Sequence, residues 1–238
     1  MRIGILICDQ VRPEFRELFD DYPIMLQHMM LKVDQHLAFS FYRAVDGQLP
    51  ESIDECDVYL TTGSKHSVND DLAWIKNLLA FIVKLDQSKK KLVGICFGHQ
   101  LIAKALGGSV STSTRGWGIG VAFNQVINAQ SWMTDDSNEL PSSLDIVVSH
   151  KEQIDELPAN TKVVANSQFC PNFMIQVESH MLGVQGHPEF SKEYSTALTN
   201  SRLDIIPANR VREGFNSLNV PIDDMKLARW ILNFFKGL

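Results

Sequence analysis

The sequence predicts an α/β protein built on a doubly wound, mostly parallel sheet of the flavodoxin or Rossmann type, with antiparallel additions. Short, continuous apolar runs such as residues 3–8 and 92–95 are typical of strands buried on both faces of a parallel sheet. Segments with apolar residues at helical spacing alternate with these runs before Gly108. After Gly108 the strand-like segments follow one another closely, which indicates antiparallel strands added to the same core.

The part of the chain before Gly108 is expected to alternate strands with helices. Strands are predicted at residues 3–8, 39–45, 57–61 and 92–95. Helices are predicted at residues 9–20, 23–31, 72–85 and 97–106. Gly107 and Gly108 then end the last of these helices.

The part after Gly108 predicts strands first and helices last. The strand candidates are residues 116–127, 144–150, 162–166, 173–177 and 182–185, with a turn at 135–138. A helix is expected at 191–206, then a link with proline and asparagine, then a final helix with an apolar stripe from Met225 to Phe235. We therefore expect one domain over residues 1–190 and a helical extension, 191–238, packed on it.

Composition excludes several classes of protein. The formal net charge of −6 argues against a nucleic-acid surface. No apolar run approaches the length of a membrane span. The four cysteines show neither C-x-x-C nor zinc-ligand spacing, so we expect free thiols, a cytoplasmic protein and no metal. There is no G-x-x-x-x-G-K-[ST] loop, and we expect no cofactor.

The sharpest chemical signal is Cys96, between the predicted strand at 92–95 and the predicted helix at 97–106. Gly94 and Gly98 flank it in a G-x-C-x-G pattern, the thiol counterpart of the nucleophile elbow in which a sharp strand-to-helix turn exposes the central side chain. At a helix N-terminus the free N–H groups and the helix dipole favour a thiolate. The alternative is a buried structural cysteine, the commoner fate of this residue.

A second pattern supplies the base that a cysteine nucleophile needs. His187 follows a strand-like segment, Pro188 fixes a turn after it, and Glu189 stands two residues on, where its carboxylate can orient the imidazole. A lone histidine is more often structural, but this one occurs in a chain that also offers the elbow. Cys96, His187 and Glu189 are therefore the candidate catalytic residues.

These two blocks carry a resemblance to a known family. Residues 94–100, G-I-C-F-G-H-Q, and 183–189, G-V-Q-G-H-P-E, resemble the signature blocks of the class I, or triad-type, glutamine amidotransferases. They are most similar to the amidotransferase domain of GMP synthetase and its stand-alone relatives. The resemblance covers about residues 1–190. It implies a Cys-His-Glu triad that releases ammonia from the side chain of glutamine through a γ-glutamyl thioester.

The predicted oxyanion hole has two backbone donors. One is the N–H of Phe97, the residue after the nucleophile. The other is expected in the loop after the third strand, where Gly63 lets the backbone approach closely. In the family this loop usually reads Gly-Gly-Pro, and here it reads Thr62-Gly63-Ser64. The alternative for Gly63 is a turn glycine without a chemical role.

The resemblance also implies substrate contacts. Gln100 lies one helical turn after Cys96, on the same side, and by the resemblance it would contact the glutamine substrate; the alternative is a plain amide on the helix surface. Ser149, His150 and Lys151 fall in a segment that resembles the family's Ser-His-Gly-Asp, whose backbone receives the amino-acid end of the substrate. Lys151 and Glu152 replace the usual Gly and Asp there. Residues 115–118 stand where the family has a hairpin, and we expect them to form a wall of the site.

Three functions remain open on the sequence. The first is a glutaminase that hands ammonia to a separate synthetase, because the chain lacks the S-G-G-x-D-S loop by which the family's synthetase domains hold ATP. The second is a γ-glutamyl peptidase or hydrolase with the same triad, as in the plant γ-glutamyl peptidases that share these motifs. Gly186 stands where most relatives carry phenylalanine, so we expect space beside His187 for a leaving group larger than ammonia. The third is a non-catalytic binding protein of the same fold.

Overall fold

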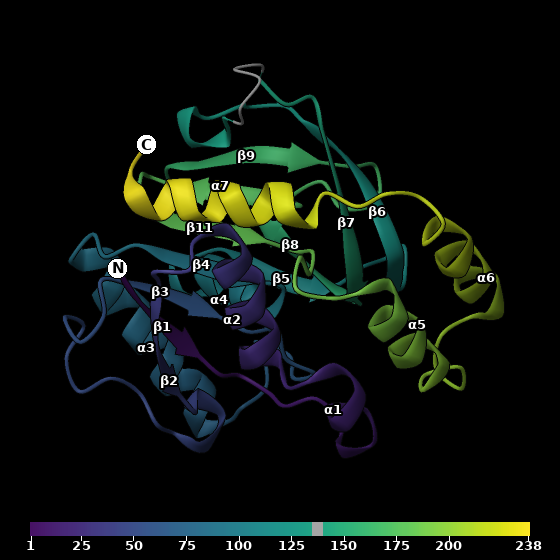
Figure 1. The fold of residues 1–238 in the computed structure, drawn as a ribbon, viewed down its shortest axis with the longest axis horizontal. Coiled ribbons are helices and arrows are strands. Elements are labelled where there is room, and N and C mark those ends of the chain that lie inside the picture. The colour runs from purple at the N-terminus through teal and green to yellow at the C-terminus, as the bar shows by residue number, and fades with distance from the viewer. Residues whose placement is uncertain (135–139) are drawn as a thin grey trace.

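The fold is an α/β sandwich around one large sheet, seen in a computed structural model that describes residues 1–134 and 140–238 (Figure 1). The turn expected at 135–138 lies outside the described residues. The strands are β1 (Arg2–Leu6), β2 (Ala38–Tyr42), β3 (Val58–Thr61), β4 (Leu92–Ile95), β5 (Ser109–Thr112), β6 (Gly118–Val126), β7 (Ser143–His150), β8 (Glu152–Glu156), β9 (Thr161–Asn166), β10 (Met174–Val177) and β11 (Met181–Val184). The α-helices are α1 (Pro13–Phe19), α2 (Tyr22–Val33), α3 (Ala73–Gln87), α4 (Phe97–Ala105), α5 (Lys192–Asn200), α6 (Ala208–Ser217) and α7 (Asp224–Lys236).

Within the described residues, nine strands form the main sheet in the order β2-β1-β3-β4-β11-β10-β9-β6-β7. The neighbours from β2 to β11 pair in parallel. From β11 onward β10, β9, β6 and β7 are added antiparallel. The predicted doubly wound parallel sheet with antiparallel additions is therefore confirmed.

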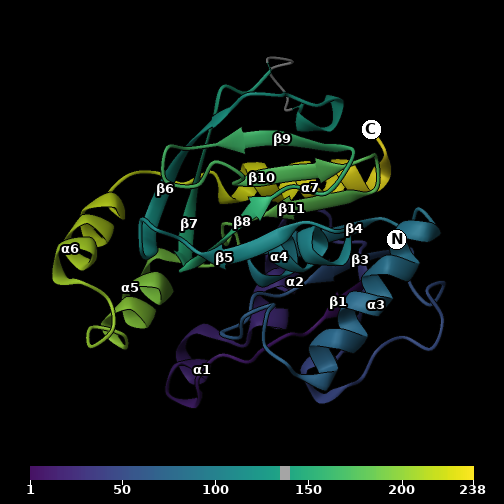
Figure 2. The same cartoon turned by 180° about the vertical axis from the view of Figure 1, so that it is seen from behind.

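Helices cover both faces of the parallel strands, as the two opposite views show (Figures 1 and 2). Helices α2 and α7 contact each other on one face, and α3 and α4 contact each other on the other. The buried side chains of β3 alternate accordingly, with Val58 and Leu60 in the core under α2 and α7 and Tyr59 in the core under α3 and α4. This two-sided burial explains why the strands read as unbroken apolar runs. No helix among the described residues has the length and apolarity needed to cross a membrane.

The structure corrects the predicted boundaries where the apolar pattern is weak. Strands β5 and β8 pair as a separate two-stranded sheet that the sequence did not predict, because both are short and half exposed. Helix α6 occupies the stretch expected to be a link, and it buries only Val211 and Gly214. Helix α5 ends at Asn200, six residues before the predicted end at 206.

The helices after residue 190 lie against the sheet. Helices α5 and α6 contact β6, and α7 contacts β7 and α2. The turn after α5 carries Arg202 to the side of the sheet where the parallel strands end, as described below.

Two glycines allow the tight turn between β4 and α4. A Cβ on Gly94 would lie 2.4 Å from the backbone carbonyl of Gly98. A Cβ on Gly98 would lie 1.6 Å from Oγ1 of Thr61 at the end of β3. Because these two glycines have no side chain, the first turn of α4 packs directly on Gly94 of β4 and on Thr61 of β3. The two strands therefore fix the position of Cys96.

We expect Gly98→Ala to destabilise the protein by about 1–3 kcal/mol, because an added methyl group overpacks the contact with Thr61. Asn77→Ala, on the exposed side of α3, is the control and should leave the melting temperature unchanged within about 1 °C. Thermal or urea unfolding of both variants measures the difference. Equal stabilities for the two variants would contradict the close packing of the elbow on β3.

Candidate active site

The candidate residues converge at the carboxyl ends of the parallel strands, the usual place for a site in an α/β sheet. The loop after β3 carries Gly63, the turn after β4 carries Cys96, and the turn after β11 carries His187. Segments far apart in the sequence thus meet at one edge because their strands are neighbours in the sheet.

Cys96 has a strained backbone. Its φ of +50° and ψ of −96° place a non-glycine residue in a sparsely populated region, and it caps the N-terminus of α4. The Cys96 N–H donates to the Val184 carbonyl at 2.7 Å, which ties the turn to the end of β11. This is the strand–turn–helix geometry predicted from the G-x-C-x-G pattern.

Pairing of β4 with β11 brings the second block beside the cysteine. Gly94 is in register with Gly183, and Ile95 with Val184. One residue further on, the Gln185 side chain donates from Nε2 to Cys96 Sγ at 3.4 Å. The His187 N–H donates to the Val147 carbonyl at 2.8 Å, so the turn that carries the imidazole is anchored to β7 as well.

The imidazole of His187 is held on two sides. Its Nδ1 lies 2.8 Å from Glu189 Oε1, and both side chains are buried. The ring of Phe190 stacks on the imidazole with centroids 3.9 Å apart and planes 10° from parallel. The carboxylate fixes the orientation of the ring, and the phenyl group prevents it from rotating away.

The electrostatic environment of His187 favours its protonated, charged form. Burial opposes protonation, but interactions with Glu189 and Cys96 outweigh it and raise the pKa of His187 to about 10. His187 is therefore protonated at neutral pH, and a charged imidazole lies beside the Cys96 sulfur. Burial raises the pKa of the Cys8 thiol far above that of a free thiol, and it raises the pKa of Cys170 to about 12. Neither thiol is therefore expected to act as a nucleophile at neutral pH.

The two other histidines near the cysteine have different properties. His99 on α4 is fully buried, and burial lowers its pKa to about 3. His150 at the end of β7 is buried, and burial lowers its pKa to about 4. Both rings are neutral at physiological pH, in contrast to the imidazole of His187. Among the described residues, no group of three or more His, Cys, Asp or Glu side chains could hold a metal ion.

The two predicted oxyanion-hole residues lie in different backbone segments, one next to Cys96 and one next to His187. Phe97 is the first residue of α4, so its N–H has no partner within the helix. Gly63 lies directly against the base, because a Cβ on it would be 2.7 Å from Cε1 of His187. The structure thus places both predicted oxyanion-hole residues next to the candidate catalytic residues.

A cavity of about 380 Å³ opens over Cys96. The four predicted substrate contacts, Gln100, Ser149, His150 and Lys151, all line it. Gln100 already donates from Nε2 to the Glu152 carbonyl at 2.9 Å and to Gln185 Oε1 at 3.1 Å, so its remaining capacity toward a ligand is that of an acceptor.

Besides the predicted contact Lys151, the lining carries the positive charges of Arg12, Lys65 and Arg202, which the sequence patterns did not reveal. Arg12, Lys65, Arg202 and Lys151 line the cavity together with one carboxylate, Glu152, whose Oε1 accepts from the Ser67 hydroxyl at 2.8 Å. The basic residues come from the loops after β1, β3, α5 and β7, and no local motif links them. Trp117, in the segment expected to form a wall, also lines the cavity.

Arg202 is the most unusual of these basic residues. It is partly buried, donates from an Nη atom to Ser149 Oγ at 2.9 Å and lies 5.7 Å from the ring centroid of Trp117. Among the described residues no carboxylate lies within ion-pair distance of its guanidinium. Burial lowers its pKa, and the neighbouring charge of Arg12 lowers it further.

The space expected beside His187 from the loss of a phenylalanine is not there. A Cβ on Gly186 would lie 2.6 Å from Ile146 Cγ2 and 2.9 Å from Phe173 Cζ, so this position faces the core. The expectation was wrong because the direction of a side chain at a strand end depends on packing. The open space lies instead in the cavity over Cys96.

The fold and the site define the class of protein as a cysteine amidohydrolase. Comparison with known proteins agrees with this class. Residues 45–203 match the family model "Glutamine amidotransferase class-I". The chain therefore belongs to the class I glutamine amidotransferase family, and it is an enzyme rather than a non-catalytic binding protein.

Among curated proteins the chain is similar to γ-glutamyl peptidases of Arabidopsis thaliana. It is 34% identical to γ-glutamyl peptidase 2 over 86% of this chain and 84% of that protein. It is 33% identical to γ-glutamyl peptidase 3 over 65% of this chain, and the match spans 64% of that protein's length. A glutamine-hydrolyzing GMP synthase subunit of Pyrococcus abyssi is 37% identical over 44% of this chain and 53% of that protein.

Solved structures confirm the fold. A glutamine amidotransferase from Thermotoga maritima superposes with a TM-score of 0.75, covering 99% of this chain and 98% of that one at 18% sequence identity. At this identity the likeness shows a shared architecture.

We expect iodoacetamide to alkylate Cys96 before the other cysteines, because its sulfur lies beside a charged imidazole and a neighbouring imidazolium makes a thiol more reactive. In His187→Gln the rate at pH 7 should fall about tenfold, because this charge is lost. Peptide mapping identifies the labelled residue. Equal alkylation rates in the two proteins would contradict the activation of Cys96 by His187.

Proposed function

We propose that this protein is a γ-glutamyl hydrolase that cleaves the amide bond between a γ-glutamyl group and an amino-acid or peptide leaving group. The observation that carries the proposal is the basic lining of the cavity over Cys96, in particular Arg202 without a carboxylate partner among the described residues. An unpaired, partly buried guanidinium is a receptor for an anion. Ammonia, which glutamine would release, offers no negative charge to it, whereas a peptide leaving group ends in a carboxylate.

The proposed mechanism begins with acyl transfer to the cysteine. The Cys96 thiolate attacks the γ-carbonyl carbon, and the oxyanion accepts hydrogen bonds from the N–H groups of Phe97 and Gly63. His187, oriented by Glu189, donates its proton to the leaving nitrogen as the carbon–nitrogen bond breaks. The leaving group departs as an amine, and a γ-glutamyl thioester remains on Cys96.

Hydrolysis completes the cycle. His187, now neutral, takes a proton from water as the water oxygen attacks the thioester carbonyl. The carbon–sulfur bond breaks, the thiolate re-forms beside the histidinium, and glutamate leaves. The net reaction consumes one water and yields glutamate and a free amine, with no change in oxidation state and no cofactor.

The cavity has complementary charges for the two ends of such a substrate. Glu152 is the carboxylate of the lining, and we assign it to the α-ammonium of the γ-glutamyl group. Ser149, His150 and Lys151 lie beside it, where they would receive the α-carboxylate, and Gln100 lines the same cavity. Arg202 and Arg12 are left for the carboxylate of the leaving group. The match to γ-glutamyl peptidases supports a γ-glutamyl peptide as the substrate.

A second candidate is glutamine hydrolysis that supplies ammonia to a synthetase. Family membership and the match to the GMP synthase of Pyrococcus abyssi favour it. In that case a separate synthetase would be the partner, and glutamine turnover would depend on its presence.

We place either enzyme in the reducing cytoplasm, because Cys8, Cys56, Cys96 and Cys170 are all free.

We expect the isolated protein to cleave γ-glutamyl dipeptides with a higher kcat/KM than glutamine. Arg202→Met should raise KM for a γ-glutamyl dipeptide with a free carboxylate about tenfold to a hundredfold, as expected for losing a hydrogen-bonded charge pair. The same variant should change KM for the corresponding dipeptide amide, or for glutamine, less than about threefold.

Arg229→Met, on the exposed side of α7, is the matched control and should resemble the wild type with every substrate. Steady-state kinetics with the three substrates decide between the two functions. Rapid turnover of glutamine with the dipeptides barely cleaved would overturn the peptidase proposal in favour of the glutaminase.

A further inference from the structure

The loop after β3 has no proline to stiffen it, although its backbone lies against the catalytic base. Gly63 in this loop approaches His187 so closely that a Cβ would be 2.7 Å from the ring. A glycine backbone is the most flexible in the chain, and a donor for an oxyanion must be held in place before the reaction. Other parts of the molecule must therefore restrain this loop.

One restraint acts at the start of the loop, through Thr62. Its side chain is fully buried; Oγ1 accepts from the Cys8 N–H at 2.9 Å and lies 3.0 Å from the Gly63 carbonyl, to which it donates. The hydroxyl thus connects the segment after β1 to the peptide group that follows Gly63. This fixes one side of the segment that holds the predicted donor.

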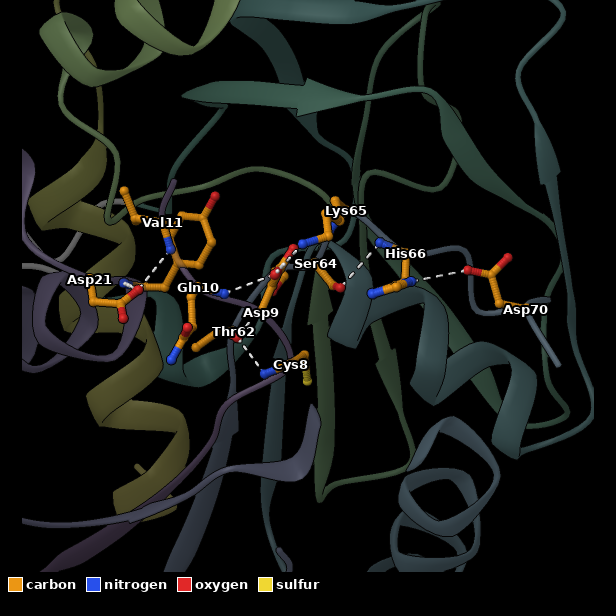
Figure 3. A network of polar contacts seen from close by, with 12 residues as sticks. Cys8, Asp9, Gln10, Val11, Asp21, Thr62, Ser64, Lys65, His66 and Asp70 are labelled. Carbon is orange, nitrogen blue, oxygen red and sulfur yellow. Dashed lines mark hydrogen bonds and ion pairs between the residues drawn. The ribbon is translucent and has the colours of Figure 1, made fainter. Parts of the chain in front are cut away.

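A second restraint acts just beyond, through Asp9 (Figure 3). This carboxylate is only 7% exposed and receives three hydrogen bonds. Oδ2 accepts from the Lys65 N–H at 2.9 Å, and Oδ1 accepts from Lys65 Nζ at 3.2 Å and from the Gln10 N–H at 2.9 Å. Asp9 therefore clamps the backbone two residues after Gly63.

The segment that bears Asp9 is itself anchored. The Val11 N–H donates to Asp21 Oδ1 at 2.8 Å, and Asp21 caps α2 (Figure 3). At its far end the loop is held by Asp70, which accepts from the Ser67 N–H at 3.1 Å. Between these fixed points Gly63 and Ser64 have little freedom to move.

We propose that Asp9 is a positioning residue for acyl transfer, which acts by clamping Lys65 so that the Gly63 N–H stays aimed at the oxyanion. Asp9 contacts neither Cys96 nor His187 in the hydrogen-bond network, so its effect is transmitted through the loop backbone. The inference rests on the proposed acyl-transfer chemistry of Cys96. It does not depend on whether the acyl donor is a γ-glutamyl peptide or glutamine.

The test compares two reactions of the same thiol in the whole protein. Acylation of Cys96 by p-nitrophenyl acetate passes through an oxyanion, and it needs no recognition of a γ-glutamyl group. Alkylation of Cys96 by iodoacetamide displaces iodide and forms no oxyanion. Asp9→Ala should slow acylation about tenfold to a hundredfold, since loss of one oxyanion donor costs that much or more. Alkylation should change less than about twofold.

Asp9→Asn keeps one oxygen acceptor and should slow acylation less than Asp9→Ala does. It therefore still tests the inference if the alanine variant folds poorly. Asp46→Asn removes an exposed carboxylate that pairs with Arg43 on a neighbouring loop, and it should match the wild type in both reactions. Acylation unchanged in both Asp9 variants, or an equal loss of acylation and alkylation, would overturn the inference. Failure to cleave γ-glutamyl peptides would instead count against the proposed function alone.

Discussion

The parallel pairing of β4 with β11 is the constraint on which the site depends. It joins residues some ninety positions apart in the sequence, with Gly94 opposite Gly183 and Ile95 opposite Val184. Where the two strands end, Cys96 turns into α4 and the chain after Gln185 turns toward His187. A slip of one residue in this register would turn alternate side chains to opposite faces of the sheet and separate the sulfur from the imidazole. The bare backbones of Gly94 and Gly98 allow the turn to sit tightly against the strands.

The sequence predicted the parts of the fold and site that local patterns encode. Buried parallel strands read as apolar runs, and an elbow needs glycines at fixed positions, so the core and Cys96 were predictable. The His-Pro-Glu turn was likewise a local pattern. By contrast, α6 and the β5–β8 pair have too few buried apolar residues to show the spacing typical of a helix or a strand. Their formation depends on contacts with the rest of the molecule.

The charges of the cavity could not be predicted in the same way. Arg12, Lys65 and Arg202 follow β1, β3 and α5, and only the topology brings them together. At Gly186, by contrast, a local pattern led to a wrong prediction, namely that the missing side chain leaves space beside His187. The sequence alone did not show that this position faces Ile146 and Phe173 in the core. The distinction between glutaminase and γ-glutamyl hydrolase therefore rests on the assembled cavity and on the relatives.

The central claim is that Cys96 carries a γ-glutamyl group taken from a peptide. Rapid acid quenching during turnover of a γ-glutamyl dipeptide, followed by mass spectrometry of the intact protein and its peptides, measures this most directly. The predicted result is a fraction of the protein heavier by one γ-glutamyl group, attached to Cys96, together with release of the free amino-acid leaving group. Turnover without such an adduct under conditions where hydrolysis limits the rate, or an adduct on Cys8, Cys56 or Cys170, would contradict it.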